Sequence, residues 1–254
     1  MIPWGAGGQG GSRFWKPLVA AAQRGLDALL PSACLLCGAA CGAEPVCADC
    51  RAELPALPPH HCPICLEATP YGERCGACLA HPLHFSELIA LYAYAFPLDR
   101  LVLALKYEAR FALARWWAEM LATRLAANAT DAILPVPLHP ERLAERGYNQ
   151  AEILARPLAR ALRLPLLADV LEKSRATPQQ SASDREARRK NLRNAFTLRP
   201  QALPHIRGKR LLLVDDVLTT GATLDEIARL LLRHGAAEIR AATVARTLKA
   251  GVFV

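Results

Sequence analysis

Two kinds of hydrophobic periodicity alternate along the chain from residue 86 onward. Short apolar or alternating runs, typical of strands, occupy residues 86–96, 131–138, 210–216 and 238–247. Longer segments with apolar residues at helical spacing occupy residues 98–107, 112–127, 149–162 and 222–236. Strands that alternate with helices of about ten or more residues favour a parallel sheet covered by helices on both faces. We therefore predict an α/β fold for this part of the chain.

Single residues indicate where some of these predicted helices begin, bend, end or pack. Asn149 is placed to cap the helix that follows it, and Pro157 is expected to kink that helix. Gly235 is expected to end the last helix. The adjacent Trp116 and Trp117 are interpreted as packing residues of their helix.

The first 30 residues have a different character from the rest. They begin glycine-rich and are then predicted to form a short amphipathic helix from Trp15 to Leu30. A signal peptide is the alternative, but Gln23 and Arg24 interrupt the apolar stretch. The chain has no run of about eighteen apolar residues, the length that a membrane-spanning helix needs. We therefore expect a soluble, cytoplasmic protein.

All nine cysteines lie between residues 34 and 78, and eight of them form two matching sets. Each set has the pattern Cys-x2-Cys-x9-Cys-x2-Cys, and the second set follows the first at an offset of 28 residues. The sets are Cys34, Cys37, Cys47 and Cys50, then Cys62, Cys65, Cys75 and Cys78. Four thiolates at this spacing can converge tetrahedrally on one metal ion. An internal duplication that forms two adjacent structural zinc ribbons is therefore predicted.

Two other uses of these cysteines are alternatives to zinc binding. A disulfide framework needs an oxidising compartment, and no export signal supports one. An iron–sulfur cluster is the second alternative, and the duplicated ribbon spacing favours zinc over it. Cys41 has no counterpart, because Thr69 holds the matching position, and His60 and His61 are assigned to the linker. Two complete four-ligand sites leave no open position for substrate, so folding or docking is their expected role.

The net charge of +8 is concentrated in one region. Residues 141–210 hold 16 Lys and Arg against 7 Asp and Glu, a balance of +9, so the rest of the chain carries −1. A solvated charged surface is the ordinary interpretation of such a region. A site for a polyanion, either a phosphorylated ligand or nucleic acid, is the sharper one.

Two adjacent carboxylates, Asp215 and Asp216, stand where a buried strand ends. Ligands of parallel sheets bind beyond the carboxyl ends of the strands. Residues 219–223, Thr-Thr-Gly-Ala-Thr, then turn from strand to helix, and the free amides of a helix start can bind phosphate. Carboxylates suit sugar hydroxyls or Mg²⁺. A phosphorylated sugar would satisfy both halves of this segment.

The segment LLLVDDVLTTGAT at residues 211–223 resembles the phosphoribosyl-pyrophosphate motif of type I phosphoribosyltransferases. Together with the doubled cysteine pattern and the segments LALKYEAR, PVPLHPERLAERGYNQA and RATPQQSASDREARRKNLRNAF, it makes nearly the whole chain similar to the ComF/GntX family. That family is phosphoribosyltransferase-like and associated with competence for DNA uptake. The resemblance implies a type I phosphoribosyltransferase-like parallel sheet flanked by helices at residues 83–254, after an extension at 1–30 and a double zinc ribbon at 31–82.

The resemblance also implies roles for individual residues. Asp215 and Asp216 would hold the ribose 2- and 3-hydroxyls, with Mg²⁺ accompanying the pyrophosphate. The 5-phosphate would be held by Thr219, Thr220, Gly221, Ala222 and Thr223. The loop that cradles pyrophosphate in this fold corresponds to PVPLHPERLAERG, where the candidates are Val136, His139, Arg142 and Arg146, although a plain turn explains its prolines equally well.

A basic segment at residues 173–193 holds seven Lys and Arg against two acids. Long loops of this kind are often functional, and in related transferases the corresponding loop is a lid over the pyrophosphate. Its candidate residues are Arg175, Arg185, Arg189 and Lys190, with a solvated helix face as the alternative. Lys106 is a further candidate for the site, although a surface lysine at a helix end explains it as well.

Two functions stay open at this point. A pentosyltransferase would bind phosphoribosyl pyrophosphate and transfer phosphoribose to a nitrogen acceptor, for which no segment is evident. A binding protein would use the same site to sense that ligand or to grip single-stranded DNA, in contact with competence-machinery proteins. Tyr148 and Phe196 are the few aromatic residues near the basic segment, which weakens base stacking as its mode of binding. The acidic pair and the basic loop favour the transferase.

Overall fold

The computed structural model describes residues 33–125, 130–174, 192 and 194–249. The chain divides into two compact units, Met1–Glu53 and Leu54–Val254. The helix predicted at Trp15–Leu30 lies outside the described residues. Among the residues that the structure describes, no helix is both long and apolar enough to cross a membrane.

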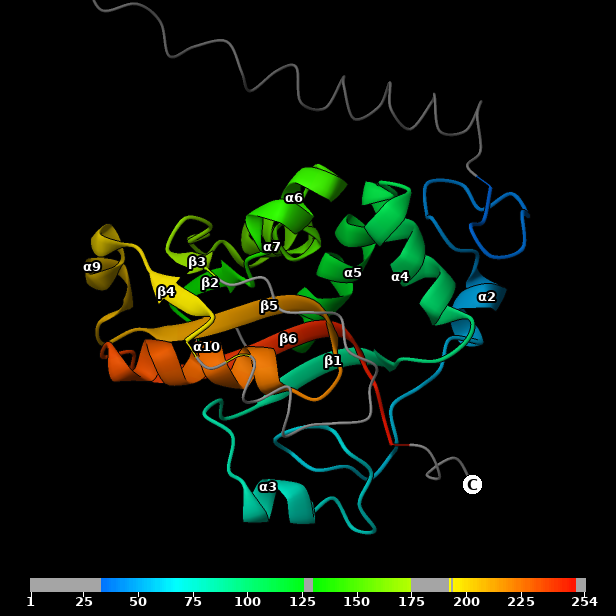
Figure 1. Cartoon of the computed structure of the whole chain (residues 1–254). Coiled ribbons are helices and arrows are strands. Elements are labelled where there is room, and N and C mark those ends of the chain that lie inside the picture. The colour runs from blue at the N-terminus through cyan, green and yellow to red at the C-terminus, as the bar shows by residue number, and fades with distance from the viewer. Residues whose placement is uncertain (1–32, 126–129, 175–191, 193, 250–254) are drawn as a thin grey trace, which may run out of the picture. The chain divides into compact units, whose positions relative to one another are not determined.

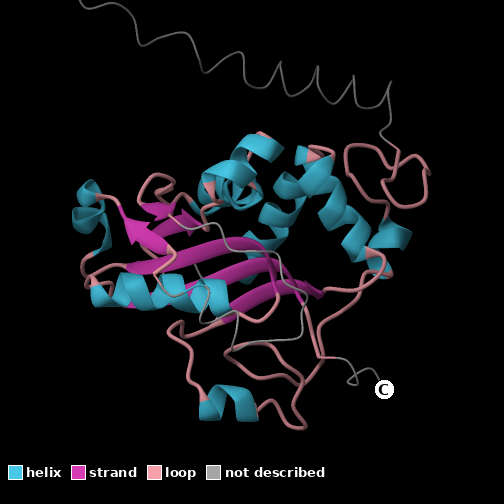
Figure 2. Ribbon diagram, in the orientation of Figure 1, coloured by secondary structure: helices cyan, strands magenta, loops and turns pink. Residues whose placement is uncertain are grey.

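A four-stranded sheet forms the centre of the larger unit, as Figure 2 shows. Its strands are β1 (Leu88–Ala93), β2 (Ala132–Pro135), β5 (Arg210–Leu218) and β6 (Glu238–Arg246). The order is β1-β6-β5-β2, and every neighbouring pair is parallel. The predicted parallel α/β sheet is therefore confirmed, with β5 and its two aspartates between β6 and β2.

Helices cover both faces of this sheet (Figure 1). Their bounds are α4 (Leu98–Tyr107), α5 (Phe111–Arg124), α7 (Gln150–Leu162) and α10 (Ala222–Arg233). Helices α5 and α7 pack together over one face, and α10 lies on the other. Residues that alternate along the strands, such as Leu211 and Leu213, join the apolar side of α10 in one core. Both faces are buried because a parallel sheet of this kind has no solvated side.

Most single-residue expectations hold. Asn149 caps α7 through its Oδ1, which accepts from the amide of Ala151 at 3.1 Å. Pro157 lies inside α7. Gly235 follows α10 with φ +92°, a conformation that favours glycine. Trp116 and Trp117 are buried, as predicted for packing residues.

Smaller elements escaped the sequence analysis. They are α6 (Pro140–Arg146), η2 (Pro200–Ala202), α9 (Leu203–Ile206) and the antiparallel pair β3 (Leu171–Lys173) with β4 (Phe196–Leu198). Helix α6 begins at a proline, which fits the first turn of a helix but also suggested a plain turn. The long basic segment connects β3 to β4, so it does join two strands as expected.

The two cysteine sets repeat one backbone design. Helix α2 (Ala48–Ala52) in the smaller unit and α3 (Gly76–Ala80) in the larger unit are offset by the same 28 residues as the cysteines. The amide of Cys34 donates to the carbonyl of Ala39 at 2.7 Å, and that of Cys62 donates to the carbonyl of Glu67 at 2.8 Å. The duplication seen in the sequence is therefore a duplication of structure.

Candidate functional site

The acidic pair lies at the carboxyl end of β5, where a parallel sheet binds its ligands. The amide of Asp216 donates to Oδ1 of Asp215 at 2.9 Å, and the amide of Val217 donates to Oδ1 of Asp216 at 2.8 Å. These local hydrogen bonds fix both carboxylates close to the backbone. Asp216 is buried at 7% exposure, and Asp215 is partly buried.

Lys106 neutralises one of the two carboxylates. Its Nζ lies 2.6 Å from Oδ2 of Asp216, and both side chains are largely buried. Burial works to lower the pKa of Lys106, but the negative charges of Asp216 and Asp215 outweigh it, so that this pKa is raised. Lys106 therefore stays charged and belongs to the site instead of the surface.

Asp215 is in a different electrostatic state. Burial and the neighbouring charge of Asp216 raise its pKa to about 8, against the opposing effects of a backbone amide and Lys106. Among the described residues, Asp215 forms no ion pair. A carboxylate held this close to another is stabilised by a bound cation or by hydroxyl donors.

The segment after β5 has the form of a phosphate loop. Gly221 has φ +81° and stands directly before α10, whose first amides point out of the helix start. A Cβ at this position would meet the Leu218 side chain at 3.9 Å, so the conformation, not space, requires glycine. Thr220 Oγ1 accepts from the amide of Ala222 at 3.4 Å, while Thr219 is exposed and Thr223 is partly buried. Backbone amides and threonine hydroxyls thus lie together at the start of α10, and a role in phosphate binding stays a prediction.

The loop after β2 runs beside the acidic strand. The amide of Val136 donates to the carbonyl of Val214 at 2.9 Å, and the carbonyl of Val136 accepts from Asn149 Nδ2 at 2.9 Å. His139 caps α6 through Nδ1, which accepts weakly from the amide of Glu141 at 3.4 Å. Asn149 therefore both starts α7 and holds the candidate pyrophosphate loop in place.

The two candidate arginines of α6 already have partners on the surface. Arg142 Nη1 donates to Glu145 Oε2 at 3.2 Å. Arg146 lies over the Tyr107 ring, with its guanidinium carbon 5.1 Å from the ring centroid. That stacking ties α6 to the end of α4, next to Lys106.

Two residues near the acidic pair were missed from the sequence. Burial lowers the pKa of Lys173 at the end of β3; Asp215 opposes this shift and Arg142 adds to it. Burial raises the pKa of Tyr94, and the charge of Lys106 opposes that shift. Lys173 and Tyr94 therefore lie within electrostatic range of the site, whereas Arg175, Arg185, Arg189 and Lys190 lie outside the described residues.

Both cysteine sets fit a tetrahedral metal ion. In each set, all four sulfur atoms lie within 4.8 Å of one another. The Sγ atoms of Cys37 and Cys47 are 3.7 Å apart, and those of Cys65 and Cys75 are 3.6 Å apart. Four bonds of about 2.3 Å to a tetrahedral zinc ion require about 3.8 Å, whereas a disulfide requires about 2.0 Å. The geometry supports zinc and contradicts a disulfide framework, and neither set includes His60 or His61.

Backbone amides prepare one thiol of each set to ionise. Burial raises the pKa of Cys34, but amides including that of Cys47, 3.4 Å from its sulfur, outweigh burial and lower this pKa to about 6. The corresponding hydrogen bonds lower the pKa of Cys62 to about 7 in the same way. Amide hydrogen bonds of this kind stabilise the thiolate, which is the form that binds metal.

Comparisons with known proteins agree with both parts of the site. Residues 147–252 match the phosphoribosyl transferase domain, and residues 25–79 match the double zinc ribbon domain. The DNA utilization protein YhgH of Escherichia coli (strain K12) is 38% identical over 195 residues, which cover 74% of this chain and 84% of that protein. Competence protein F of Haemophilus influenzae is 35% identical over 211 residues, which cover 79% of this chain and 90% of that protein.

A solved adenine phosphoribosyltransferase from Leishmania tarentolae is a more distant likeness. It is 16% identical with a TM-score of 0.34, and the match covers 52% of this chain and 70% of that one. The fold assignment rests instead on the domain match and on the strand order of the sheet.

Proposed function

The chain belongs to the ComF family of competence-linked, phosphoribosyltransferase-like proteins, and on that premise we propose that it binds phosphoribosyl pyrophosphate with Mg²⁺ and transfers phosphoribose to a nitrogen acceptor. In that transfer, the bond from C1 of the ribose to pyrophosphate breaks, a bond from C1 to nitrogen forms, and the nitrogen gives up a proton. The proposal places the chain in the cytoplasm, where thiols stay reduced and able to bind zinc.

The unequal state of the two aspartates carries the proposal. Asp216 is neutralised by Lys106 at 2.6 Å, whereas Asp215 has a raised pKa and no ion-pair partner among the described residues. A carboxyl whose pKa is raised by burial and by a like charge is typical of functional sites, because a bound cation or hydroxyl donor then favours its ionised form. The remaining carboxylate fits a ribose diol or a hydrated Mg²⁺ that is shared with pyrophosphate.

Each neighbouring element then has a task in binding. The amides and hydroxyls of residues 219–223 would hold the 5-phosphate at the start of α10. The backbone from Val136 to His139, with Arg142 and Lys173 nearby, would hold the pyrophosphate. Mg²⁺, when bound, supplies charge neutralisation for the leaving pyrophosphate. Lys106 would keep Asp216 ionised and in position for a ribose hydroxyl.

A binding protein for single-stranded DNA is the second candidate, and the local charge of +9 over residues 141–210 favours it. The names of the relatives, DNA utilization protein and competence protein, favour the same function and also suggest competence proteins as partners. Such binding would be dominated by phosphate contacts and would weaken steeply with salt.

Pyrophosphate release distinguishes the two candidates. The metal-loaded full chain would be given phosphoribosyl pyrophosphate, Mg²⁺ and a panel of nitrogen nucleophiles, beside the Asp215→Asn/Asp216→Asn variant. Release that depends on both the acceptor and the aspartates supports the transferase. Tight ligand binding without release for any acceptor, together with salt-sensitive binding of single-stranded DNA, would support the binding protein instead.

A further inference from the structure

Arg246, at the end of β6, is a buried charge with an unusual set of partners. Its exposure is 1%, and its guanidinium donates to groups from three separate segments. Nε donates to the carbonyl of Cys65 at 2.8 Å, and Nη2 donates to Oε2 of Glu67 at 3.0 Å. Nη1 donates to the carbonyl of Thr219 at 2.5 Å and also to the carbonyl of Thr247.

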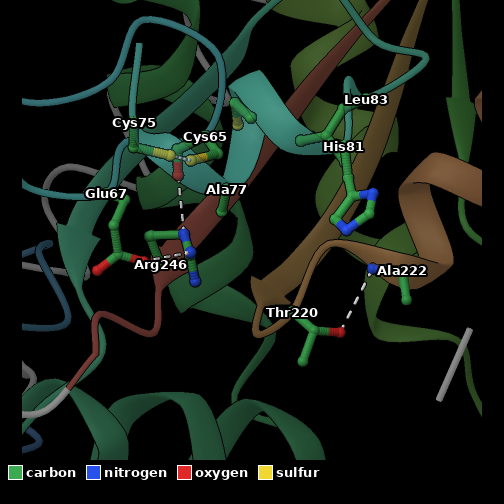
Figure 3. A pocket seen from close by; sticks show the side chains of 10 residues that line it. Cys65, Glu67, Cys75, Ala77, His81, Leu83, Thr220, Ala222 and Arg246 are labelled. Carbon is green, nitrogen blue, oxygen red and sulfur yellow. Dashed lines mark hydrogen bonds and ion pairs between the residues drawn. The ribbon is translucent and has the colours of Figure 1, made fainter. Parts of the chain in front are cut away.

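These partners connect two sites that the sequence presents as separate. Cys65 is a ligand of the second cysteine set, and Thr219 opens the phosphate loop. Figure 3 shows Arg246 reaching the segment with Cys65 and Glu67, near Thr220 of the loop. Residues of both sites, among them Cys65, Thr220 and Arg246, line one cavity of about 400 Å³. A single side chain therefore contacts both the metal-binding turn and the loop proposed to bind phosphate.

Glu67 is the part of this arrangement that metal binding does not need. In the first cysteine set the matching position is Ala39, although two backbone hydrogen bonds of its turn, from Cys34 to Ala39 and from Gly38 to Cys34, recur in the second set. Glu67 is 7% exposed, and its second oxygen accepts from the amide of Lys249 at 3.1 Å. The carboxylate thus compensates the charge of Arg246 and fixes the chain after β6, tasks that are absent from the first set.

We propose that Arg246 is a positioning residue that couples metal occupancy of the second cysteine set to phosphate binding by residues 219–223. Loss of the metal frees the turn that presents Cys65 and Glu67. Arg246 would then lose its acceptors at Cys65 and Glu67, and its buried charge would be only partly compensated. Its guanidinium would shift, which weakens its hydrogen bond to the Thr219 carbonyl. Coupling of this kind is reciprocal, so a ligand in the phosphate loop strengthens metal binding by the same factor.

The phosphate half of this proposal rests on the proposed function, so the test has one arm with a ligand and one without. In the first arm, a chelator withdraws zinc from the full chain with and without ribose 5-phosphate, which lacks the metal-binding pyrophosphate group. The Cys34→Ser/Cys37→Ser variant lacks the first zinc, so the zinc that is withdrawn comes from the second set alone. The ligand should slow zinc withdrawal or strengthen zinc affinity by about fivefold or more.

In the second arm, hydrogen exchange of the amides at residues 218–223 is compared before and after zinc removal, with no ligand present. Exchange at these amides should rise by about tenfold or more when the second set is emptied, and removal of the first zinc alone should leave it unchanged.

Variants test whether the coupling passes through Arg246. Arg246→Lys and Glu67→Gln should reduce both effects while zinc still binds. Arg240→Lys is the matched control, because Arg240 lies on the same strand about 20 Å away and pairs with Glu87 at 2.6 Å. It should leave both effects intact.

The outcomes separate the two proposals. Unchanged exchange at residues 218–223 after removal of the second zinc would overturn the coupling, whether or not ribose 5-phosphate binds. Increased exchange without any binding of ribose 5-phosphate would keep the structural link and count against the proposed function. Equal effects in Arg246→Lys and the unsubstituted chain would overturn the role of Arg246.

Discussion

The two cysteine sets share one backbone design but differ in what their other residues touch. Gly38 follows the first pair of ligands with φ +78°, whereas Leu66 holds the matching position at φ +59° and is buried in the main core. Ala39 of the first set is replaced by Glu67, the partner of Arg246. A duplicated metal site has thus become, in its second copy, a component of the larger unit.

This difference shows where a repeated unit gains a second role. The ligands set the metal chemistry, and both copies keep all four of them. The residues between the ligands are free to change, and in the second copy they contact the core under the sheet and Arg246 at the end of β6. Substitutions that separate metal binding from these contacts test this difference between the two sets.

The largest expected difference comes from removing each metal site. Cys65→Ser/Cys75→Ser should lower the free energy of unfolding of the unit Leu54–Val254 by on the order of 5 kcal/mol, because a structural metal and its packed turn are lost together. Cys37→Ser/Cys47→Ser should leave that unit's transition unchanged. Calorimetry with zinc analysis checks both, and equal losses would contradict the comparison.

Lys106→Met removes the cation that pairs with Asp216. It leaves Asp216 buried without its cation, so the free energy of unfolding should fall by about 2 kcal/mol, less than for a fully buried pair. Both zinc ions should remain, because the electrostatic partners of Lys106 among the described residues are Asp216, Asp215 and Tyr94, and none of these is a cysteine. Denaturant unfolding measures the loss, and Lys106→Met/Asp216→Leu should recover most of it. Loss of zinc from the Lys106→Met variant would show that the Lys106–Asp216 pair and zinc binding are not independent.

The raised pKa of Asp215, about 8, predicts a pH dependence of ligand binding that zinc retention should not share. Mg²⁺-dependent binding needs the ionised carboxylate, so affinity should rise about tenfold or more between about pH 6.5 and 8.5 and then level off. Calorimetry at several pH values checks this, with Asp215→Asn as the variant that should remove the rise.

The same shift affects stability with the opposite trend. The folded carboxyl keeps its proton up to about pH 8, whereas the unfolded one loses it near 3.8. Its contribution to the free energy of unfolding is therefore full below about pH 4 and is lost as the pH rises through 8. Without ligand, Asp215→Asn should be more stable than the unsubstituted chain at pH 9 and about equal to it at low pH.

The smallest effect is expected at the matched turn positions. Leu66→Gly removes a buried side chain but relieves a left-handed conformation, so a net loss of about 1–2 kcal/mol is expected. Gly38→Ala meets no atom within 4 Å and should cost the smaller unit about 1 kcal/mol through its backbone alone. Thermal unfolding compares the two, and a larger cost at Gly38 would reverse the comparison.

The sequence was most informative where one local pattern fixes one element. The apolar run before Asp215, the positive-φ glycine after it and the cap at Asn149 each have a single local cause. The parallel sheet, the cysteine clusters and the turn from β5 into α10 could therefore be predicted. Lys106 was ambiguous from sequence, because its pairing with Asp216 joins residues 110 positions apart.

The rest depends on contacts between distant segments. Arg246 lies in a predicted apolar strand, where a charged side chain requires a buried partner, but the sequence does not show which residue that partner is. That partner is Glu67, an acidic residue that lies two positions after the ligand Cys65. Strands β3 and β4 have three residues each, too few for a periodic pattern, so the position of Lys173 beside Asp215 could not be foreseen.

The most direct test of the account is a calorimetric titration of the zinc-loaded full chain with phosphoribosyl pyrophosphate and Mg²⁺. The account predicts one site whose affinity falls about 100-fold or more in a folded, zinc-loaded Asp215→Asn/Asp216→Asn variant, because two charged hydrogen-bonding groups are lost. Absence of binding by the folded, zinc-loaded chain, or equal binding by the variant, would contradict it.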